Sequence, residues 1–358
     1  MTAVNPDRLA IARTAYDEVS LYDPKREPVL LDLTDNTNLW GVPPAAARAI
    51  SECAQSTIAR YPSLYSSELK RALAEHSGVT PDMVVTGCGS DDIIDSTMRA
   101  FGNEGDLVAA SDPTFAMIPI FARMNALRST LISELPEHEA DADALLASGA
   151  TILYVCSPNN PTGGLVARRA LERLVDSFAG LLLLDEAYVE FAGVSNIDLL
   201  ARSPRLLIVR TMSKAFGLAG LRVGYALGQP ALVREVEKSR GPYKVSALAE
   251  QVAIIALRDD AQWVREHVQL AIENRDRLTV ELLRLGLDPM PSSANFVCVP
   301  VRDCVAVSLA MRAKGVGVRP FPKLPHVGDA LRISVGPWTM VETCVKTLAT
   351  VLRKGVRT

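Results

Sequence analysis

A lysine that directly follows a predicted buried strand is the residue of this sequence best suited to covalent chemistry. Lys214 lies within residues 210–225, Arg-Thr-Met-Ser-Lys-Ala-Phe-Gly-Leu-Ala-Gly-Leu-Arg-Val-Gly-Tyr, just after the apolar run 206–209. Burial disfavours the ammonium form of a lysine, and the neutral amine can form a Schiff base with a carbonyl compound. Considered alone, Lys214 also fits a surface lysine in a polar turn.

Two more predicted strands end in polar side chains. Asp185 follows the leucine run 181–184, and an acid at the end of a buried run needs a cationic partner. Capping of the following turn is the alternative role for Asp185. Asn159 lies in Ser-Pro-Asn-Asn-Pro-Thr-Gly (157–163), after the apolar run 150–155. Two prolines and two asparagines in this segment predict a non-helical turn that exposes side-chain amides.

A third segment has the pattern of a phosphate site. The apolar strand predicted at 83–86 is followed by a glycine turn and then by a helical pattern over 93–101. Gly89, Ser90 and Asp91 would therefore present unpaired backbone N–H groups at the positive end of a helix dipole. Ser90 or Asp91 could equally cap the helix, and the two roles are compatible.

The segment around Lys214 resembles the lysine segment of the fold-type I pyridoxal-phosphate enzymes, and it is most similar to the histidinol-phosphate aminotransferase family. Other segments of that pattern follow in the expected order over roughly residues 30–340. The resemblance implies pyridoxal 5′-phosphate attached to Lys214. It further implies Asp185 at the pyridine nitrogen of the cofactor, with Tyr188 and Asn159 at its ring oxygen.

The same resemblance implies how the rest of the cofactor is held. Phe115, in Asp-Pro-Thr-Phe (112–115), would stack on the ring. Ser213 and Arg222 would bind the phosphate together with the turn at 89–91. Tyr61, in Arg-Tyr-Pro, would reach the phosphate of the neighbouring subunit, so a homodimer with shared active sites is expected.

The substrates implied are a small-molecule amino donor and a keto-acid acceptor, most specifically histidinol phosphate and 2-oxoglutarate. The residues that the resemblance assigns to them are Arg332, within the alternating strand 331–335, Arg319, Asn36, and one tyrosine of the N-terminal arm, Tyr22 or Tyr16. Thr37 and Leu39 depart from the family's Asn-Glu-Asn-Pro sequence, so the substrate stays open at this point.

Three alternatives to histidinol phosphate transamination remain. Relatives with the same cofactor residues act on aromatic amino acids or decarboxylate threonine phosphate. A cofactor-binding transcriptional regulator is disfavoured, because a resemblance over about residues 30–340 leaves no room for a DNA-binding domain.

Apolar strands that alternate with helical stretches predict an α/β fold with a mostly parallel sheet covered on both faces. The resemblance implies seven strands in that sheet and a smaller α+β domain at the C-terminal end. We expect an N-terminal arm over 1–32, a large cofactor-binding domain over 33–245 and a small domain over 246–358. A single helix is predicted over 45–59, where alanine is frequent.

Composition restricts the function further. The chain has 358 residues, of which 48% are hydrophobic and 22% charged, and a net charge of −3 gives no reason to expect nucleic acid or a membrane as a partner. The six cysteines and four histidines lack metal-ligand spacing, so no metal is expected. Without a recognisable targeting segment, we expect a reduced, cytoplasmic protein.

Overall fold

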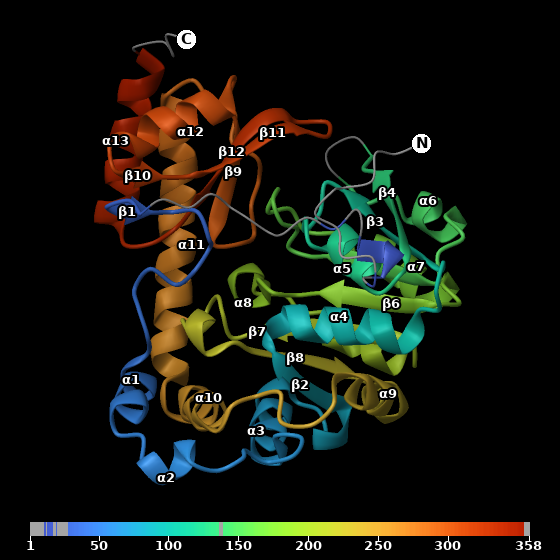
Figure 1. The fold of residues 1–358 in the computed structure, drawn as a ribbon. Helices are drawn as coiled ribbons and strands as arrows, with labels where there is room; N and C mark the ends of the chain where they lie inside the picture. Colours follow the sequence, from blue (N-terminus) through green and yellow to red (C-terminus); the bar gives the residue numbers. More distant parts are fainter. Residues whose placement is uncertain (1–10, 12, 17–18, 20–27, 136–138, 354–358) are drawn as a thin grey trace.

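The computed structural model describes residues 11, 13–16, 19, 28–135 and 139–353 and consists of a large and a small body (Figure 1). Within these residues the large body contains a seven-stranded sheet in the order β2-β8-β7-β6-β5-β3-β4. Its strands are β2 (Val84–Cys88), β3 (Leu107–Asp112), β4 (Arg128–Ser133), β5 (Ile152–Cys156), β6 (Leu181–Asp185), β7 (Leu206–Thr211) and β8 (Val223–Gly228). Only β8 runs antiparallel to its neighbours, which confirms the predicted mostly parallel sheet.

The central strands are apolar along their whole length because both of their faces are buried. Leu182 and Leu184 of β6 face one core, and Leu183 faces the other. The first core packs under α3 (Ser67–Ser77), α6 (Ala142–Ala147), α7 (Arg168–Ser177) and α10 (Ala247–Asp259). The second packs under α4 (Gly89–Phe101), α5 (Ile118–Met124) and α9 (Pro230–Arg240).

The small body is built on an antiparallel sheet in the order β11-β12-β9, formed by β11 (Arg319–Leu324), β12 (Gly328–Ser334) and β9 (Phe296–Pro300). Helices α12 (Cys304–Arg312) and α13 (Trp338–Arg353) pack against it. β1 (Leu31–Asp32) pairs in parallel with β10 (Val316–Gly317), and the next residue, Leu33, is fully buried in the same core. The chain therefore passes through the small body before it enters the large one.

One long helix connects the two bodies. In Figure 1, α11 (Ala261–Arg284) runs from the base of the large body to the small one. Val264 and Ala271 of α11 belong to the large-body core, whereas Leu278 and Leu282 belong to the small-body core. The domain boundary at 245/246 stays a prediction, and the packing of α10 in the large body favours a border inside α11.

The helix predicted over 45–59 is interrupted. The structure has α1 (Pro44–Ser51) and α2 (Gln55–Ile58), with Ala54 in an extended conformation between them. Ala46 and Ala49 of α1 are buried in the large-body core, and no residue of α2 is buried. The alanine content favours a helix along the whole run, but it does not indicate where the packing ends.

Two features are absent from the described residues. No helix among them combines the length and the apolar character needed to cross a membrane. Likewise, the described part of the chain contains no group of three or more His, Cys, Asp or Glu side chains that could hold a metal ion.

Candidate active site

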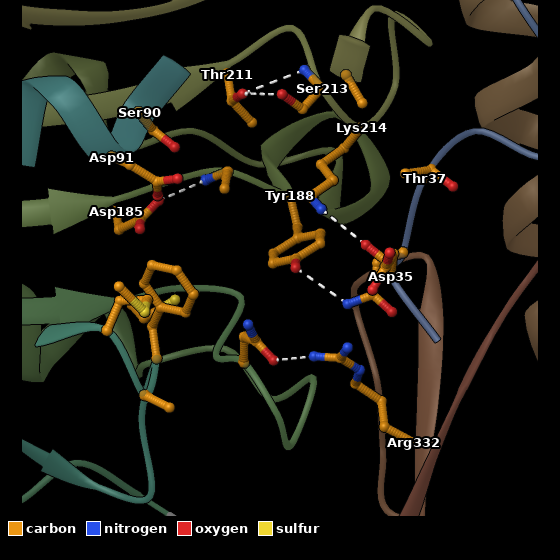
Figure 2. A pocket seen from close by; sticks show the side chains of 18 of the residues that line it. Asp35, Thr37, Ser90, Asp91, Asp185, Tyr188, Thr211, Ser213, Lys214 and Arg332 are labelled. Carbon is orange, nitrogen blue, oxygen red and sulfur yellow. Dashed lines mark hydrogen bonds between the residues drawn. The ribbon is translucent and has the colours of Figure 1, made fainter. Parts of the chain in front are cut away.

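A cavity of about 320 Å³ opens where the carboxyl ends of β5, β6 and β7 face the small body and the segment 35–37 (Figure 2). Ligand sites of open α/β sheets lie at this edge. Most of the residues predicted for the site line this cavity: Asn36, Ser90, Asp91, Phe115, Asp185, Tyr188, Ser213, Lys214, Arg222, Arg319 and Arg332. Residues far apart in the sequence thus surround one space.

Lys214 lies three residues after β7 and points into the cavity (Figure 2). Its Nζ donates a hydrogen bond to the Asp35 carbonyl at 3.0 Å and lies 5.7 Å from the centre of the Tyr188 ring. Burial, with a smaller contribution from the Arg332 cation, lowers the pKa of Lys214 to about 8. At neutral pH about a tenth of this amine is therefore unprotonated, and nucleophilic attack requires that neutral form.

Asp185 ends β6, and its buried carboxylate faces the cavity. Its Oδ2 accepts a hydrogen bond from the Tyr154 hydroxyl at 2.6 Å, and its Oδ1 accepts one from the Ala187 amide at 3.0 Å. Burial raises the pKa of Asp185 to about 6, and both hydrogen bonds oppose that rise. Its hydrogen bonds come from neutral groups, so a cation in the cavity would find a carboxylate held ready for it.

The N-terminus of α4 forms another wall of the cavity. Cys88 occupies its N-cap position and its side chain makes no capping hydrogen bond, so neither Ser90 nor Asp91 is the N-cap residue. The Cys88 amide donates to Asp92 Oδ2 at 2.9 Å. Gly89 has a φ of +81°, and a Cβ there would lie 2.3 Å from Nη2 of Arg222. The absence of that side chain lets Arg222 approach the helix end, where its Nη2 lies 3.3 Å from Asp91 Oδ2. Unpaired N–H groups beside a guanidinium form a suitable site for a dianion.

Tyr188 and Asn36 connect the large body to the N-terminal segment. Asn36 donates through Nδ2 to the Tyr188 hydroxyl at 3.1 Å, and its Oδ1 accepts from the Ser334 hydroxyl at 2.8 Å. The Asn295 amide donates to the Asn36 carbonyl at 2.9 Å. Burial raises the pKa of Tyr188 to about 12, so its hydroxyl keeps its proton and can donate it in a hydrogen bond.

Arg332, on β12, is buried between the rings of Phe296 and Phe321, with its Cζ 5.4 Å from each ring centre. Its guanidinium donates to the Thr34 carbonyl at 2.6 Å and to the Asn160 side-chain oxygen. Its Nε has no hydrogen-bond partner within the described residues. A buried cation with neutral acceptors and one unpaired donor is suited to bind an anion.

Arg319 and Phe115 line the cavity at less buried positions. Arg319 is the cross-strand partner of Arg332 in the β11–β12 pair, so the two guanidinium groups belong to one sheet. Phe115 is partly buried and packs against the core under α4 and α5. Phe115 lies three residues after β3, and its role in stacking stays a prediction.

The structure does not bring Asn159 into the cavity lining, and its contact with the ring oxygen of a cofactor stays a prediction. Asn159 is buried outside the cavity lining, and its Nδ2 donates to the Pro113 carbonyl at 3.0 Å and to the Thr162 hydroxyl at 2.9 Å. Asn160 lines the cavity in its place. Adjacent side chains of a non-helical turn point in different directions, and the composition of the motif cannot distinguish the two asparagines.

Of the three tyrosines predicted to reach an active site, the two within the described residues, Tyr61 and Tyr16, do not line this cavity. Tyr61 is 84% exposed and lies beside Tyr243, with ring centres 5.0 Å apart. Tyr16 belongs to the short helix η1 (Thr14–Tyr16), close to α5, and is 43% exposed. Tyr22 lies outside the described residues. The cross-subunit role of Tyr61 and the role of an arm tyrosine stay predictions.

Comparisons with known proteins agree with this geometry. The family model described as aminotransferase class I and II matches residues 28–348. The chain belongs to the class I and II aminotransferases. Among curated members, it is 32% identical to a histidinol-phosphate aminotransferase of Thermoanaerobacter sp. strain X514, over 88% of this chain and 91% of the relative. It is 37% identical to another with that name from Roseiflexus castenholzii, over 86% of this chain and 85% of the relative.

A solved aminotransferase structure is similar over nearly the whole chain. The histidinol-phosphate aminotransferase of Sinorhizobium meliloti, in complex with pyridoxal-5′-phosphate, has a TM-score of 0.87 and 25% sequence identity, and the match covers 99% of each chain. The predicted fold-type I architecture is thereby confirmed for this aminotransferase. An L-threonine-O-3-phosphate decarboxylase from Porphyromonas gingivalis has a TM-score of 0.81 at 22% identity, so one fold accommodates both enzymes.

Sequence reasoning missed two side chains of this aminotransferase that contact predicted site residues. Tyr154, which donates to Asp185, stands in the middle of β5, and a tyrosine inside an apolar strand is a signal that its hydroxyl has a buried partner. Asn160, which accepts from Arg332, was visible in the motif but was not chosen.

Proposed function

We propose that the chain is a pyridoxal-phosphate-dependent aminotransferase that transfers the amino group of L-histidinol phosphate to 2-oxoglutarate, giving imidazole acetol phosphate and glutamate. Membership of the aminotransferase family and the names of its curated relatives support the reaction. The observation that carries the proposal is the arrangement of Lys214, Asp185 and the N-terminus of α4 around one cavity.

The described residues fit the cofactor at its three polar points. The uncapped end of α4, together with Ser90, Ser213 and Arg222, would bind the phosphate, with Gly89 leaving room for the guanidinium. Asp185 would meet the pyridine nitrogen, because its buried carboxylate is hydrogen-bonded only to neutral groups. Lys214 would supply the amine that holds the aldehyde.

When bound, pyridoxal phosphate supplies an electron sink for the pair released as the amino donor loses its α-proton. Asp185 would keep the ring nitrogen protonated, and Tyr154 fixes that carboxylate in place. The Lys214 amine, once displaced by the amino donor, would act as the base that moves the proton. Tyr188, and Asn160 rather than Asn159, are the cavity side chains suited to hold the ring oxygen.

The anion-binding side of the cavity supports a substrate with a phosphate or carboxylate group. Arg332 would bind that anion through its guanidinium, and Arg319 would bind a second one. Asn36 would act mainly by holding the Tyr188 hydroxyl, since both ends of its amide are already engaged by protein groups. A contribution of Tyr22 to substrate binding remains part of this proposal.

We also propose a homodimer. Tyr61, Tyr243 and the neighbouring Ile58, Leu64 and Tyr65 are large side chains left exposed on one part of the surface, and a second copy of the chain would cover them. A cytoplasmic location is likewise a proposal. It is supported by the six cysteines, all of which are free thiols, as a reducing compartment favours.

A half-reaction screen tests the proposed function. The cofactor-loaded protein is mixed with histidinol phosphate, glutamate, phenylalanine, tyrosine or threonine phosphate, and the absorbance spectrum of the bound cofactor and the keto product are measured. Histidinol phosphate and glutamate should convert the cofactor completely, and the aromatic amino acids more slowly. A preference for phenylalanine or tyrosine would overturn the substrate assignment, and release of CO₂ from threonine phosphate without keto product would overturn the transaminase assignment.

A further inference from the structure

The turn after β6 carries two side chains that face the cavity and one that does not. Asp185 and Tyr188 line the cavity, whereas Glu186 between them is absent from its lining and has a side chain only 1% exposed. A buried carboxylate next to the proposed pyridine partner costs free energy unless it is fully paired. The hydrogen-bond partners of Glu186 therefore fix the conformation of the turn after β6.

Glu186 is paired at both oxygens. Its Oε2 accepts hydrogen bonds from Nε and Nη2 of Arg210 at 3.1 and 2.7 Å. Its Oε1 accepts from the backbone amide and the side-chain amide of Asn196 at 2.8 and 3.1 Å. Nη2 of Arg210 also donates to the Ser195 hydroxyl at 2.5 Å. The carboxylate thus joins the turn after β6, strand β7 and the loop at 195–196.

Arg210 lies on β7, four residues before Lys214, and its side chain is only 7% exposed. The Glu186–Arg210 pair therefore connects the strand end that carries Asp185 to the strand end that leads to Lys214. A buried ion pair is often no more stabilising than apolar side chains of the same volume. Its presence beside this site calls for a role other than stability.

We propose that Arg210 is a positioning residue, which acts through Glu186 to hold Asp185 and Tyr188 toward the cavity and to balance the negative charge placed next to Asp185. The inference rests on the proposed function, because the ionisation of Asp185 matters for a ring nitrogen bound beside it. Arg210 does not line the cavity, so any effect of it on the cofactor must pass through Glu186 or through charge.

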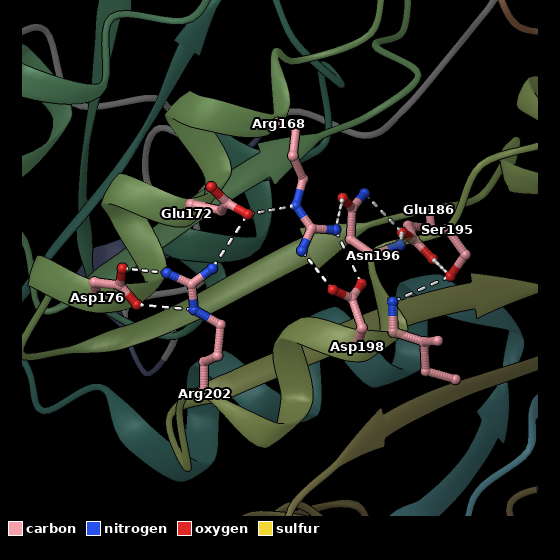
Figure 3. Close-up of polar contacts among 9 residues, drawn as sticks. Arg168, Glu172, Asp176, Glu186, Ser195, Asn196, Asp198 and Arg202 are labelled. Atoms are coloured by element: carbon pink, nitrogen blue, oxygen red, sulfur yellow. Dashed lines mark hydrogen bonds and ion pairs between the residues drawn. The ribbon is translucent and has the colours of Figure 1, made fainter.

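The same hydrogen-bond network extends to the surface, which supplies a matched comparison. Figure 3 shows Arg168 between Glu172, Asp198 and Asn196, with Asn196 leading inward to Glu186. Arg168 is 41% exposed, and exposed ion pairs contribute at most about 1 kcal/mol. Arg168 therefore serves as a control that belongs to the network but lies at its solvent end.

Several titratable groups surround the two carboxylates. Asp185 faces Tyr154 and Cys156 of β5, Asp91 of α4, and Tyr188 and Glu186 of its own turn. Arg210 faces Glu186, Glu190, Tyr225 and, at the edge of α3, His76. The charges of Asp91 and Glu186 both raise the pKa of Asp185, so loss of the Arg210 cation should raise it further and loss of the Glu186 charge should lower it.

The experiment measures the dissociation constant of pyridoxal phosphate between pH 5 and 8 for the wild type, Arg210→Gln, Glu186→Gln, the double variant and Arg168→Gln. Affinity should fall below the pKa of Asp185, because a protonated carboxyl no longer pairs with the pyridinium. The midpoint is the pH at which half of this fall in affinity has occurred. Relative to the wild type, we expect it to move up by roughly half to one pH unit in Arg210→Gln and down in Glu186→Gln. The double variant should return toward the wild type, and Arg168→Gln should leave the midpoint unchanged.

The outcomes separate the inference from the proposed function. If the wild-type protein does not bind pyridoxal phosphate at all, the proposed function fails. If it binds, and both single variants weaken binding equally at every pH without moving the midpoint, the pair is only a structural brace and the inference is overturned. Midpoints that move in the same direction would also overturn it. If circular dichroism shows that Arg210→Gln does not fold, Glu186→Gln still tests the inference. A lower midpoint would support the inference, and an unchanged or higher midpoint would overturn it.

Discussion

The two sides of the cavity are assembled in different ways. On the proposed cofactor side, Asp185, Lys214 and the end of α4 all belong to the large body, and each lies at the carboxyl end of a strand of the same sheet or within three residues of it. On the anion side, Arg319 and Arg332 come from the small body, Asn160 comes from the turn after β5, and residues 34–37 come from the segment after β1. A rigid sheet thus fixes the first side, whereas the second depends on how the two bodies and the N-terminal segment meet.

The electrostatics of the two sides differ accordingly. On the cofactor side, burial moves both ionisable groups toward neutrality, lowering the pKa of Lys214 to about 8 and raising that of Asp185 to about 6. On the anion side, the buried Arg332 keeps its charge and its hydrogen bonds go to neutral oxygens. The proposed function would place the covalent chemistry on the first side and the binding of the substrate's anionic group on the second.

The largest expected effect comes from removing the amine. Lys214→Ala should lower the turnover number by roughly 10²–10⁴-fold or more, because the base that moves the substrate proton is lost. Far-ultraviolet circular dichroism should be unchanged. Lys238→Ala, which removes an exposed lysine of α9, is the matched control and should keep wild-type turnover. Turnover of Lys214→Ala within tenfold of the wild type would remove this lysine from the mechanism.

A smaller effect is expected on the anion side. Arg332→Ala should lower kcat/KM for phosphate-bearing donors roughly thirty- to several thousand-fold, mainly through a higher KM. This corresponds to a loss of about 2–5 kcal/mol of transition-state stabilisation. Arg332→Lys should recover part of the loss, because an ammonium keeps the charge without the planar fork. If the KM of Arg332→Ala stayed at the wild-type value while turnover alone fell, the assignment of anion binding to Arg332 would be wrong.

The smallest effect concerns stability and pH. In the unfolded chain Lys214 has its ordinary pKa of 10.5, and in the folded protein the pKa is about 8. Between these values the unfolded state binds more protons, so the free energy of unfolding contributed by this residue rises with pH across that window. We therefore expect the difference in melting temperature between the cofactor-free wild type and Lys214→Met to change with pH. It should shift by about 2–6 °C in favour of the wild type as the pH rises from 7.5 to 10. A difference that stays constant with pH would show that the amine is not buried.

Apolar runs in the sequence indicated where the residues proposed for the cofactor side would lie. The leucines of β6 lead to Asp185, and residues 206–209 lead to Lys214, so burial of the run implies where the next side chain lies. The composition of the motif could not distinguish Asn159 from Asn160, and only the path of the chain shows that Asn160 lines the cavity.

The sequence by itself indicated the strands β2, β5, β6 and β7 of the large sheet and the lysine that follows β7, since an apolar run is a local signal of a buried strand. The tertiary structure decided which neutral oxygens meet Arg332, that Asn36 bridges Ser334 and Tyr188, and that Arg210 reaches Glu186. Those contacts join residues up to 298 positions apart. Their geometry follows from how whole layers pack, and no local pattern of residue types encodes it.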